Sequence, residues 1–228
     1  MFTCLLFATH ISIAQNAVMD MLKSWKKNNE AQVLTYEYKI SLRKKGATQL
    51  DDSITGTLYK SQDCYLDSNN SYLSLRNDKH FCKLDFASKK AVVVYIESLK
   101  NMLGDNVDMK PKIFDISDSI IVKYGKLSMS KLANGHYQID IQFTNQNIEH
   151  VCLEINGKTK QLMSMNMLID DKDKYGDNTG YERLFVLKNF RYNVDNHVFS
   201  TDRFFKTSNN KIVLTSKYSK YHLNTITN

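Results

Sequence analysis

The chain has 228 residues, of which 42% are hydrophobic and 24% charged, and its formal net charge is +7. This composition is typical of a globular protein with one substantial core, and no apolar run approaches the roughly 18 residues of a membrane-spanning helix. The 31 Lys and Arg residues are dispersed and are not interleaved with aromatics as in nucleic-acid motifs. We therefore expect no nucleic-acid partner, and regard anionic lipid head groups, met in a peripheral membrane contact, as the better match for the charge.

Residues 1–15 resemble an export signal rather than part of the fold. They carry no acidic or basic side chain, have an apolar centre, and place Ser12 and Ala14 before a cleavage site at Gln15. The alternative is a buried N-terminal strand. The signal predicts an exported, periplasmic protein. We expect the remaining residues 16–228 to form one domain, with a C-terminal extension after about residue 206.

Three cysteines remain after the signal: Cys64, Cys82 and Cys152. An odd number in an exported protein leaves at least one thiol free or paired with another chain. Cys64 and Cys82 could form a disulfide if their strands lie close enough, since bridging requires Cα atoms within about 7 Å. The sequence leaves this open.

The first predicted element is an amphipathic helix that begins at Asn16, a good capping residue. Val18, Met21, Leu22 and Trp25 recur at the spacing of one helix face. This apolar stripe needs a surface to cover, and the sheet predicted next is the only large candidate.

Strict alternation of apolar and polar residues then predicts strands that bury one face only. Leu34, Tyr36, Tyr38 and Ile40 show it first. The expected strands of this half are 33–44, 52–60, 63–67, 71–76, 80–86 and 91–96. The turns are marked by Asn, which forms side-chain turns and tolerates left-handed backbone; the pairs are Asn69-Asn70, Asn77-Asp78, Asn134-Gly135, Asn156-Gly157 and Asn209-Asn210.

The alternation lapses between residues 97 and 118. We expect a short helix at 97–103 and a second helix or a lid over the segment up to residue 116. Strands resume at 120–132, 136–144, 148–156, 160–169, 182–194 and about 198–206, and a last strand follows Lys211. The predicted fold is mainly β (α+β): a strongly curved antiparallel sheet, or incomplete β-barrel, of about 11 strands with helices on the concave side. A sandwich and a closed barrel are the alternatives.

One segment has the outline of a calcium-binding loop. Asp171, Asp173, Asp177 and Glu182 stand at positions 1, 3, 7 and 12 of such a loop. Tyr175 takes the place of an oxygen ligand, and the flanking residues are strand-like. A polar hairpin loop explains the same residues, so the sequence predicts no bound metal.

The methionines Met163, Met165 and Met167 share one face of a predicted strand. Such a stripe packs in a core or lines a cavity that accepts varied apolar ligands. The histidines lack the spacing of a zinc site, and no motif of a nucleophile, a phosphate-binding loop or a metalloprotease is present. The sequence predicts a protein that is not an enzyme and has no cofactor.

Two groups of short motifs follow the predicted strands in order. The first is Gly56-Thr57-Leu58-Tyr59-Lys60, Tyr65-Leu66, Ser71-Tyr72-Leu73-Ser74, Asn77-Asp78-Lys79 and Asp85-Phe86-Ala87-Ser88-Lys89. The second is Gly135 to Ile141, Leu153 to Thr159, Phe190-Arg191-Tyr192-Asn193, Phe199 and Phe204. Over roughly residues 16–206, this order resembles the outer-membrane lipoprotein carrier family, LolA/LolB-like. Ser61-Gln62 stands where that family commonly has Arg-Pro, whose Arg helps to hold a helical lid shut.

The resemblance implies an incomplete barrel, closed by helices, whose apolar interior takes acyl chains without a cofactor. From it we expect an exported carrier or sensor of lipid or lipoprotein acyl chains, or of another apolar ligand. The alternative is a non-enzymatic envelope protein with a packed interior that binds a protein partner. The candidates for the inner wall are Leu34, Tyr36, Tyr38, Ile40, Tyr137, Ile139, Ile141, Met163, Met165 and Met167.

Overall fold

The computed structural model describes residues 16–27, 33–61, 63–103, 118–144, 146–172, 178–208 and 211–226. The predicted signal peptide, the segment 104–116 and the turn at Asn209-Asn210 lie outside these ranges. Residues 16–27 form the predicted N-terminal helix, followed by α2 (Ile96–Leu103) and α3 (Asp118–Tyr124). None of the helices in these ranges has the length and apolar composition needed to cross a membrane.

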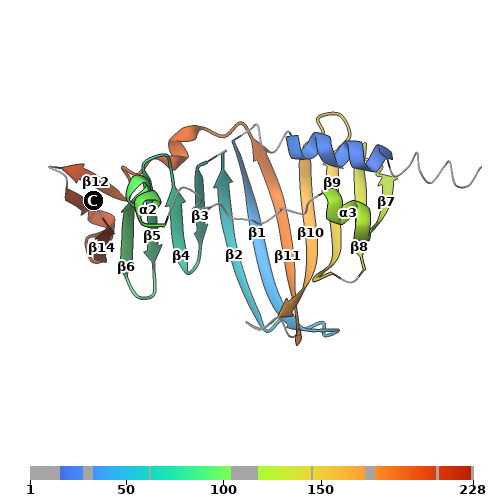
Figure 1. Ribbon diagram of the computed structural model, residues 1–228, viewed down its shortest axis with the longest axis horizontal. Helices are drawn as coiled ribbons and strands as arrows, with labels where there is room; N and C mark the ends of the chain where they lie inside the picture. Colours follow the sequence, from blue (N-terminus) through green and yellow to red (C-terminus); the bar gives the residue numbers. More distant parts are fainter. Residues whose placement is uncertain are drawn as a thin grey trace, which may run out of the picture. The chain divides into compact units, whose positions relative to one another are not determined.

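Most of the described chain is strand (Figure 1). The strands are β1 (Leu34–Lys44), β2 (Asp52–Lys60), β3 (Tyr65–Asn69), β4 (Tyr72–Arg76), β5 (His80–Asp85), β6 (Lys90–Tyr95), β7 (Gly125–Lys131), β8 (His136–Phe143), β9 (Ile148–Asn156), β10 (Leu162–Lys172), β11 (Asn178–Tyr192), β12 (Phe205–Ser208), β13 (Lys211–Leu214) and β14 (His222–Ile226).

Twelve strands are hydrogen-bonded in the order β14-β6-β5-β4-β3-β2-β1-β11-β10-β9-β8-β7, and β12 pairs with β13 in a second sheet. The large sheet is therefore open, with β14 and β7 as its end strands, and the predicted mainly β fold with an open sheet is confirmed. One pairing was not expected: β14 runs parallel to β6.

The chain divides into two compact units, each made of separate segments. Unit 1 comprises residues 1–31, 38–54 and 114–190, and unit 2 comprises residues 32–37, 55–113 and 191–228. That residues 16–228 form a single domain stays a prediction. The units are described one at a time below.

The asparagine turns form as the sequence predicts. The Asn69 side-chain oxygen accepts hydrogen bonds from the backbone N–H groups of Ser71 and Tyr72, at 2.8 and 2.9 Å. Asn77 and Asn156 each accept two bonds in the same way, from the residues two and three positions later. Each side chain thus satisfies turn donors that no strand partner reaches, which fixes short hairpins.

Two predicted strands begin instead as helical segments. Residues 118–124 form α3, although Ile120, Ile121 and Val122 are β-branched and favour strands. Asp118 lies in the first turn of α3, where a negative charge is favoured by the helix dipole. Residues 196–199 form a 3-10 helix capped by Asp195, whose side chain accepts a hydrogen bond from the His197 N–H at 2.9 Å.

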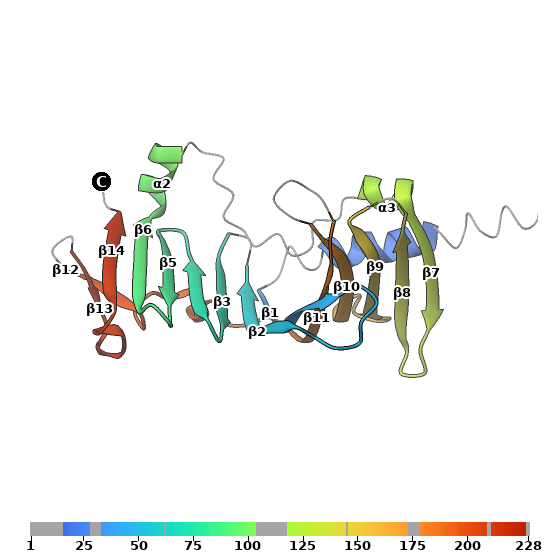
Figure 2. The same ribbon diagram turned by 90° about the horizontal axis from the view of Figure 1, so that it is seen from below.

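The C-terminal extension belongs to the core of unit 2. After β11 the chain crosses the ends of β3, β4 and β5 and continues into β12, β13 and β14 (Figures 1 and 2). Its apolar side chains fill a cluster with those of β3 to β6. The buried members are Leu66, Leu73, Leu75, Cys82, Leu84, Ala91, Val93, Phe199, Phe204, Phe205, Ile212 and Tyr218.

A pair of substitutions in the β12–β13 hairpin tests this role. Phe205 is 1% exposed, whereas Val213 is 56% exposed in the paired strand. Phe205→Ala is expected to lower the free energy of unfolding by about 3–5 kcal/mol, because it leaves a cavity in the core. Val213→Ala is the control and should change it by less than about 0.5 kcal/mol. Equal urea-denaturation midpoints for the two variants would contradict the conclusion that the C-terminal extension is part of the core of unit 2.

Candidate functional site

The candidate site is the buried face of the sheet in unit 1. Antiparallel register places Ile139, Leu153 and Met165 opposite one another across β8, β9 and β10, and Leu187 of β11 continues the row. The next row contains Ile141, Val151 and Met167. All seven side chains are buried. They make one continuous apolar surface, as period-two alternation requires when strands pair in register.

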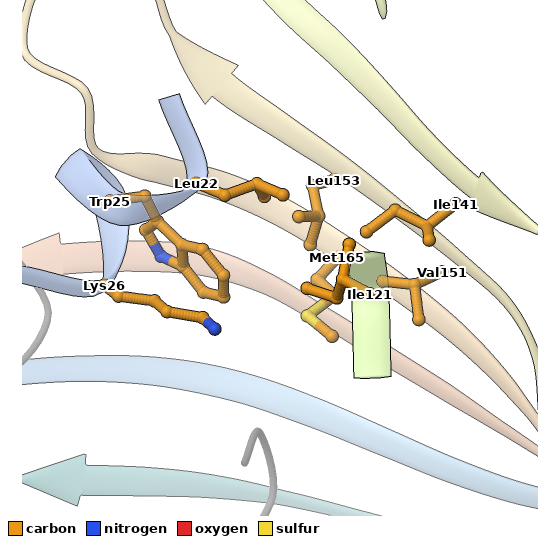
Figure 3. A pocket seen from close by; sticks show the side chains of 8 residues that line it. All are labelled: Leu22, Trp25, Lys26, Ile121, Ile141, Val151, Leu153 and Met165. Carbon is orange, nitrogen blue, oxygen red and sulfur yellow. The ribbon is translucent and has the colours of Figure 1, made fainter. Parts of the chain in front are cut away.

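Two helices cover this surface. The N-terminal helix buries all four positions of the stripe seen in the sequence, Val18, Met21, Leu22 and Trp25, and α3 buries Ile121. A cavity of about 20 Å³ remains between the helices and the sheet (Figure 3). It is lined by Leu22, Trp25, Lys26, Ile121, Ile141, Val151, Leu153 and Met165. This is about the volume needed for one water molecule, whereas ligand pockets usually reach several hundred Å³.

The two helices are held to different degrees. Ile121 is the buried side chain of the seven-residue α3, and its neighbour Val122 is 59% exposed. An ion pair joins Asp118, in the first turn of α3, to Lys26 of the N-terminal helix. Both partners are partly exposed, so this pair adds at most about 1 kcal/mol. Burial of the one Ile side chain contributes about 1.5–3 kcal/mol, so these two contributions together amount to a few kcal/mol.

A glycine allows α3 to lie close to the sheet. A Cβ atom at Gly125, the first residue of β7, would stand 2.6 Å from the backbone oxygen of Ile121. It would also stand 3.1 Å from a methyl group of Ile141, which lines the cavity. Any larger residue at this position therefore has to push the last turn of α3 away.

One polar group at the cavity has no partner. The indole Nε1 of Trp25 is buried and makes no hydrogen bond within the described part of the protein. The tryptophan as a whole is 5% exposed. Leaving a buried N–H unpaired is unfavourable by about 1–3 kcal/mol, so such a group requires an explanation.

The predicted inner-wall residues are distributed over both units. Ile141 and Met165 line the cavity, and Ile139 and Met167 lie buried on the same face. Tyr137 is only partly buried. In β1, Leu34 and Tyr36 belong to unit 2 and Tyr38 to unit 1, and these three are buried. Ile40 is half-buried, and the next buried residue of the strand is Ser41.

Met163 does not share the face of Met165 and Met167. A bulge in β10 aligns Leu162 with Ile155 and Ser164 with Glu154, so Met163 is the extra residue. The bulge shifts the alternation by one position, and the fully buried Leu162 takes the place in the row that the sequence pattern gave to Met163.

Six cavity residues were not among the candidates: Leu22, Trp25, Lys26, Ile121, Val151 and Leu153. The helical stripe contained the signal for Leu22 and Trp25, and alternation in residues 148–156 contained that for Val151 and Leu153. Ile121 was predicted to lie in a strand (residues 120–132), so its place on a covering helix was not foreseen. No local pattern distinguishes Lys26 from other lysines at a helix end.

The oxygens proposed for calcium are used differently where the structure describes them. Glu182, 3% exposed in β11, pairs with Arg43 of β1. Asp171 pairs with Arg183 at 2.7 Å. Asp173 and Asp177 lie outside the described residues. Within the described ranges, no group of three or more His, Cys, Asp or Glu could hold a metal ion.

The cysteines Cys64, Cys82 and Cys152 are all free, so the candidate Cys64–Cys82 disulfide does not form. Burial raises the pKa of Cys82 to about 12. Burial, and then the neighbouring carboxylates Asp78 and Asp140, raise the pKa values of Cys64 and Cys152 to about 11. These groups stay protonated near neutral pH, where a thiol is a poor nucleophile.

Similar solved structures include an uncharacterized conserved protein from Thermus thermophilus, with 9% identity, a TM-score of 0.43, and 92% of this chain and 99% of that chain covered. A LolA superfamily protein from Nitrosomonas europaea has 6% identity and a TM-score of 0.32, over 80% of this chain and 98% of that chain. The Mycobacterium tuberculosis lipoprotein LppX has 7% identity and a TM-score of 0.41, over 79% and 97%. No protein-family model and no curated protein matches the chain.

The structural matches thus include a member of the LolA superfamily, the class of protein that the sequence resembles. At identities of 6–9% and TM-scores below 0.5, the three structures contribute nothing to the choice of ligand or partner. That choice depends on the residues of the cavity.

The Arg43–Glu182 pair provides a test of the local structure. Arg43→Met should leave the carboxylate of Glu182 buried without a partner and lower the free energy of unfolding by about 3 kcal/mol. Arg183→Met is the matched control, because its side chain is 53% exposed, and should cost less than about 1 kcal/mol. Thermal and urea unfolding measure both. If the wild type became more stable when calcium was added, that result would instead support the calcium-binding loop at residues 171–182.

Proposed function

We propose that this protein binds a single apolar chain, such as the acyl chain of a lipid or lipoprotein, against the covered sheet face of unit 1, and carries or senses it in the periplasm. The observation that supports this most directly is the contrast between a continuous apolar face and the weakly held α3 that covers part of it. The export signal predicted in residues 1–15 supports the compartment.

Binding requires α3 to move, because the closed cavity has only about 20 Å³. Displacing α3 exposes Ile121 and breaks the Lys26–Asp118 pair, at a cost of roughly 2–4 kcal/mol. Each methylene that is transferred from water contributes about 0.8 kcal/mol. About three to five buried methylenes therefore offset the opening, and longer chains bind with a net gain.

The small cavity also supports a second candidate, an envelope interaction protein whose interior stays packed. In that case the helices never leave the sheet, and a partner protein binds elsewhere. The two candidates differ in one measurable respect: only a carrier takes up free long-chain amphiphiles.

The first test is lipid extraction and mass spectrometry of the purified protein, followed by titration of the delipidated protein with 1-dodecanol. The single tryptophan, Trp25, lies at the cavity, so its fluorescence reports directly on the site. We expect co-purified lipid and a saturable change in emission. The absence of both would favour the packed interaction protein.

A second test weakens the hold on α3. Ile121→Ala lowers the cost of opening, so we expect it to tighten the binding of 1-dodecanol roughly tenfold while lowering the stability of the empty protein. Val122→Ala, at an exposed position of the same helix, is the control and should leave both unchanged. Weaker binding by Ile121→Ala would show that α3 belongs to the ligand site rather than to its cover.

A further inference from the structure

The surface of the cavity is apolar, and two of the residues that line it carry polar groups at one end. Six of the eight lining residues have aliphatic or thioether side chains, and the polar groups belong to Trp25 and Lys26. Figure 3 shows the indole nitrogen on the side of the ring that faces the Lys26 side chain. The apolar cavity thus has two polar groups close to one end, both carried by residues that line it.

Both groups at this end are hydrogen-bond donors, and neither is an acceptor. The Trp25 N–H is buried without a partner within the described ranges, and the Lys26 ammonium pairs with Asp118 of α3. In the closed protein, the N–H makes no hydrogen bond within the described ranges, and the ammonium pairs with a carboxylate. Both groups therefore match a ligand that brings an anionic oxygen of its own.

We infer that the ligand is a single-chain amphiphile with an anionic oxygen head group, which takes the place of Asp118. Its chain lies on Ile141, Val151 and Leu153, while a head-group oxygen accepts the Trp25 N–H and pairs with Lys26. Because the same lysine helps to hold α3, the incoming anion also releases the cover. This inference rests on the proposed function and adds the chemical class of the ligand.

The test compares the dissociation constants of dodecanoate and 1-dodecanol by calorimetry, below their aggregation limits. The readout is the ratio of the two constants, because both ligands bury the same alkyl chain and differ only in the head group, which competes with Asp118 for Lys26 when it is anionic. We expect the wild type to favour dodecanoate roughly tenfold, the usual gain of a charge-assisted hydrogen bond. Dodecyl phosphate is the third probe: if it binds more tightly than dodecanoate, the head group is of the phospholipid type, and if less tightly, of the fatty-acid type.

Four variants assign the preference to residues. Trp25→Phe keeps an apolar ring and should reduce the ratio several-fold, and Lys26→Met should bring it close to one. Asp118→Asn removes the resident anion and should raise the ratio. Lys23→Met removes an exposed charge from the same helix and should leave it unchanged.

The outcomes separate this inference from the proposed function. Equal binding of dodecanoate and 1-dodecanol by the wild type, or a ratio that neither Trp25→Phe nor Lys26→Met alters, overturns the anionic head group and leaves an apolar carrier. Failure of the wild type to bind any of the probes overturns the carrier together with it.

Discussion

The sheet of unit 1 has one apolar face that must stay covered, and much of the structure follows from this requirement. The row of Ile139, Leu153 and Met165 would expose a contiguous patch of the kind that causes association in water. A second sheet could cover such a face permanently. Here two short helices do so, and they bury unequal amounts of apolar side chain: the N-terminal helix buries an entire stripe. In α3, Ile121 is the buried residue, and a partly exposed ion pair joins this helix to the N-terminal one.

This arrangement changes what the volume of the cavity can reveal. A rigid pocket must already have the size of its ligand, but a face covered by a removable helix exchanges one apolar cover for another. The apolar area hidden from water is then similar before and after binding, so a nearly filled interior is compatible with uptake of a long chain. The decisive quantity is the free energy of moving α3 rather than the empty volume beneath it.

The sequence predicted what depends on local periodicity and missed what depends on register and competition between elements. Alternation correctly placed Ile139 and Ile141 on a buried face, and the asparagine turns formed as expected. No local sequence pattern predicts the bulge that takes Met163 out of register with Met165 and Met167, because the bulge is set by the pairing of β10 with β9. The β-branched run in α3 favours a strand, and its helical state follows from contacts that only the fold supplies.

The two donors beside the cavity, the Trp25 N–H and the Lys26 ammonium, connect these features. The sequence has Ser61-Gln62 where the carrier family that it resembles has an arginine that holds the lid, and within unit 1 the Lys26–Asp118 pair joins α3 to the neighbouring helix. An ion pair is a selective latch, since an anion competes for the lysine and a neutral molecule does not. The unpaired Trp25 N–H destabilises the closed state slightly, and a ligand oxygen would remove that penalty. Opening of the cover and recognition of the head group would then depend on the same two donors, so that an anionic amphiphile lowers the cost of its own entry.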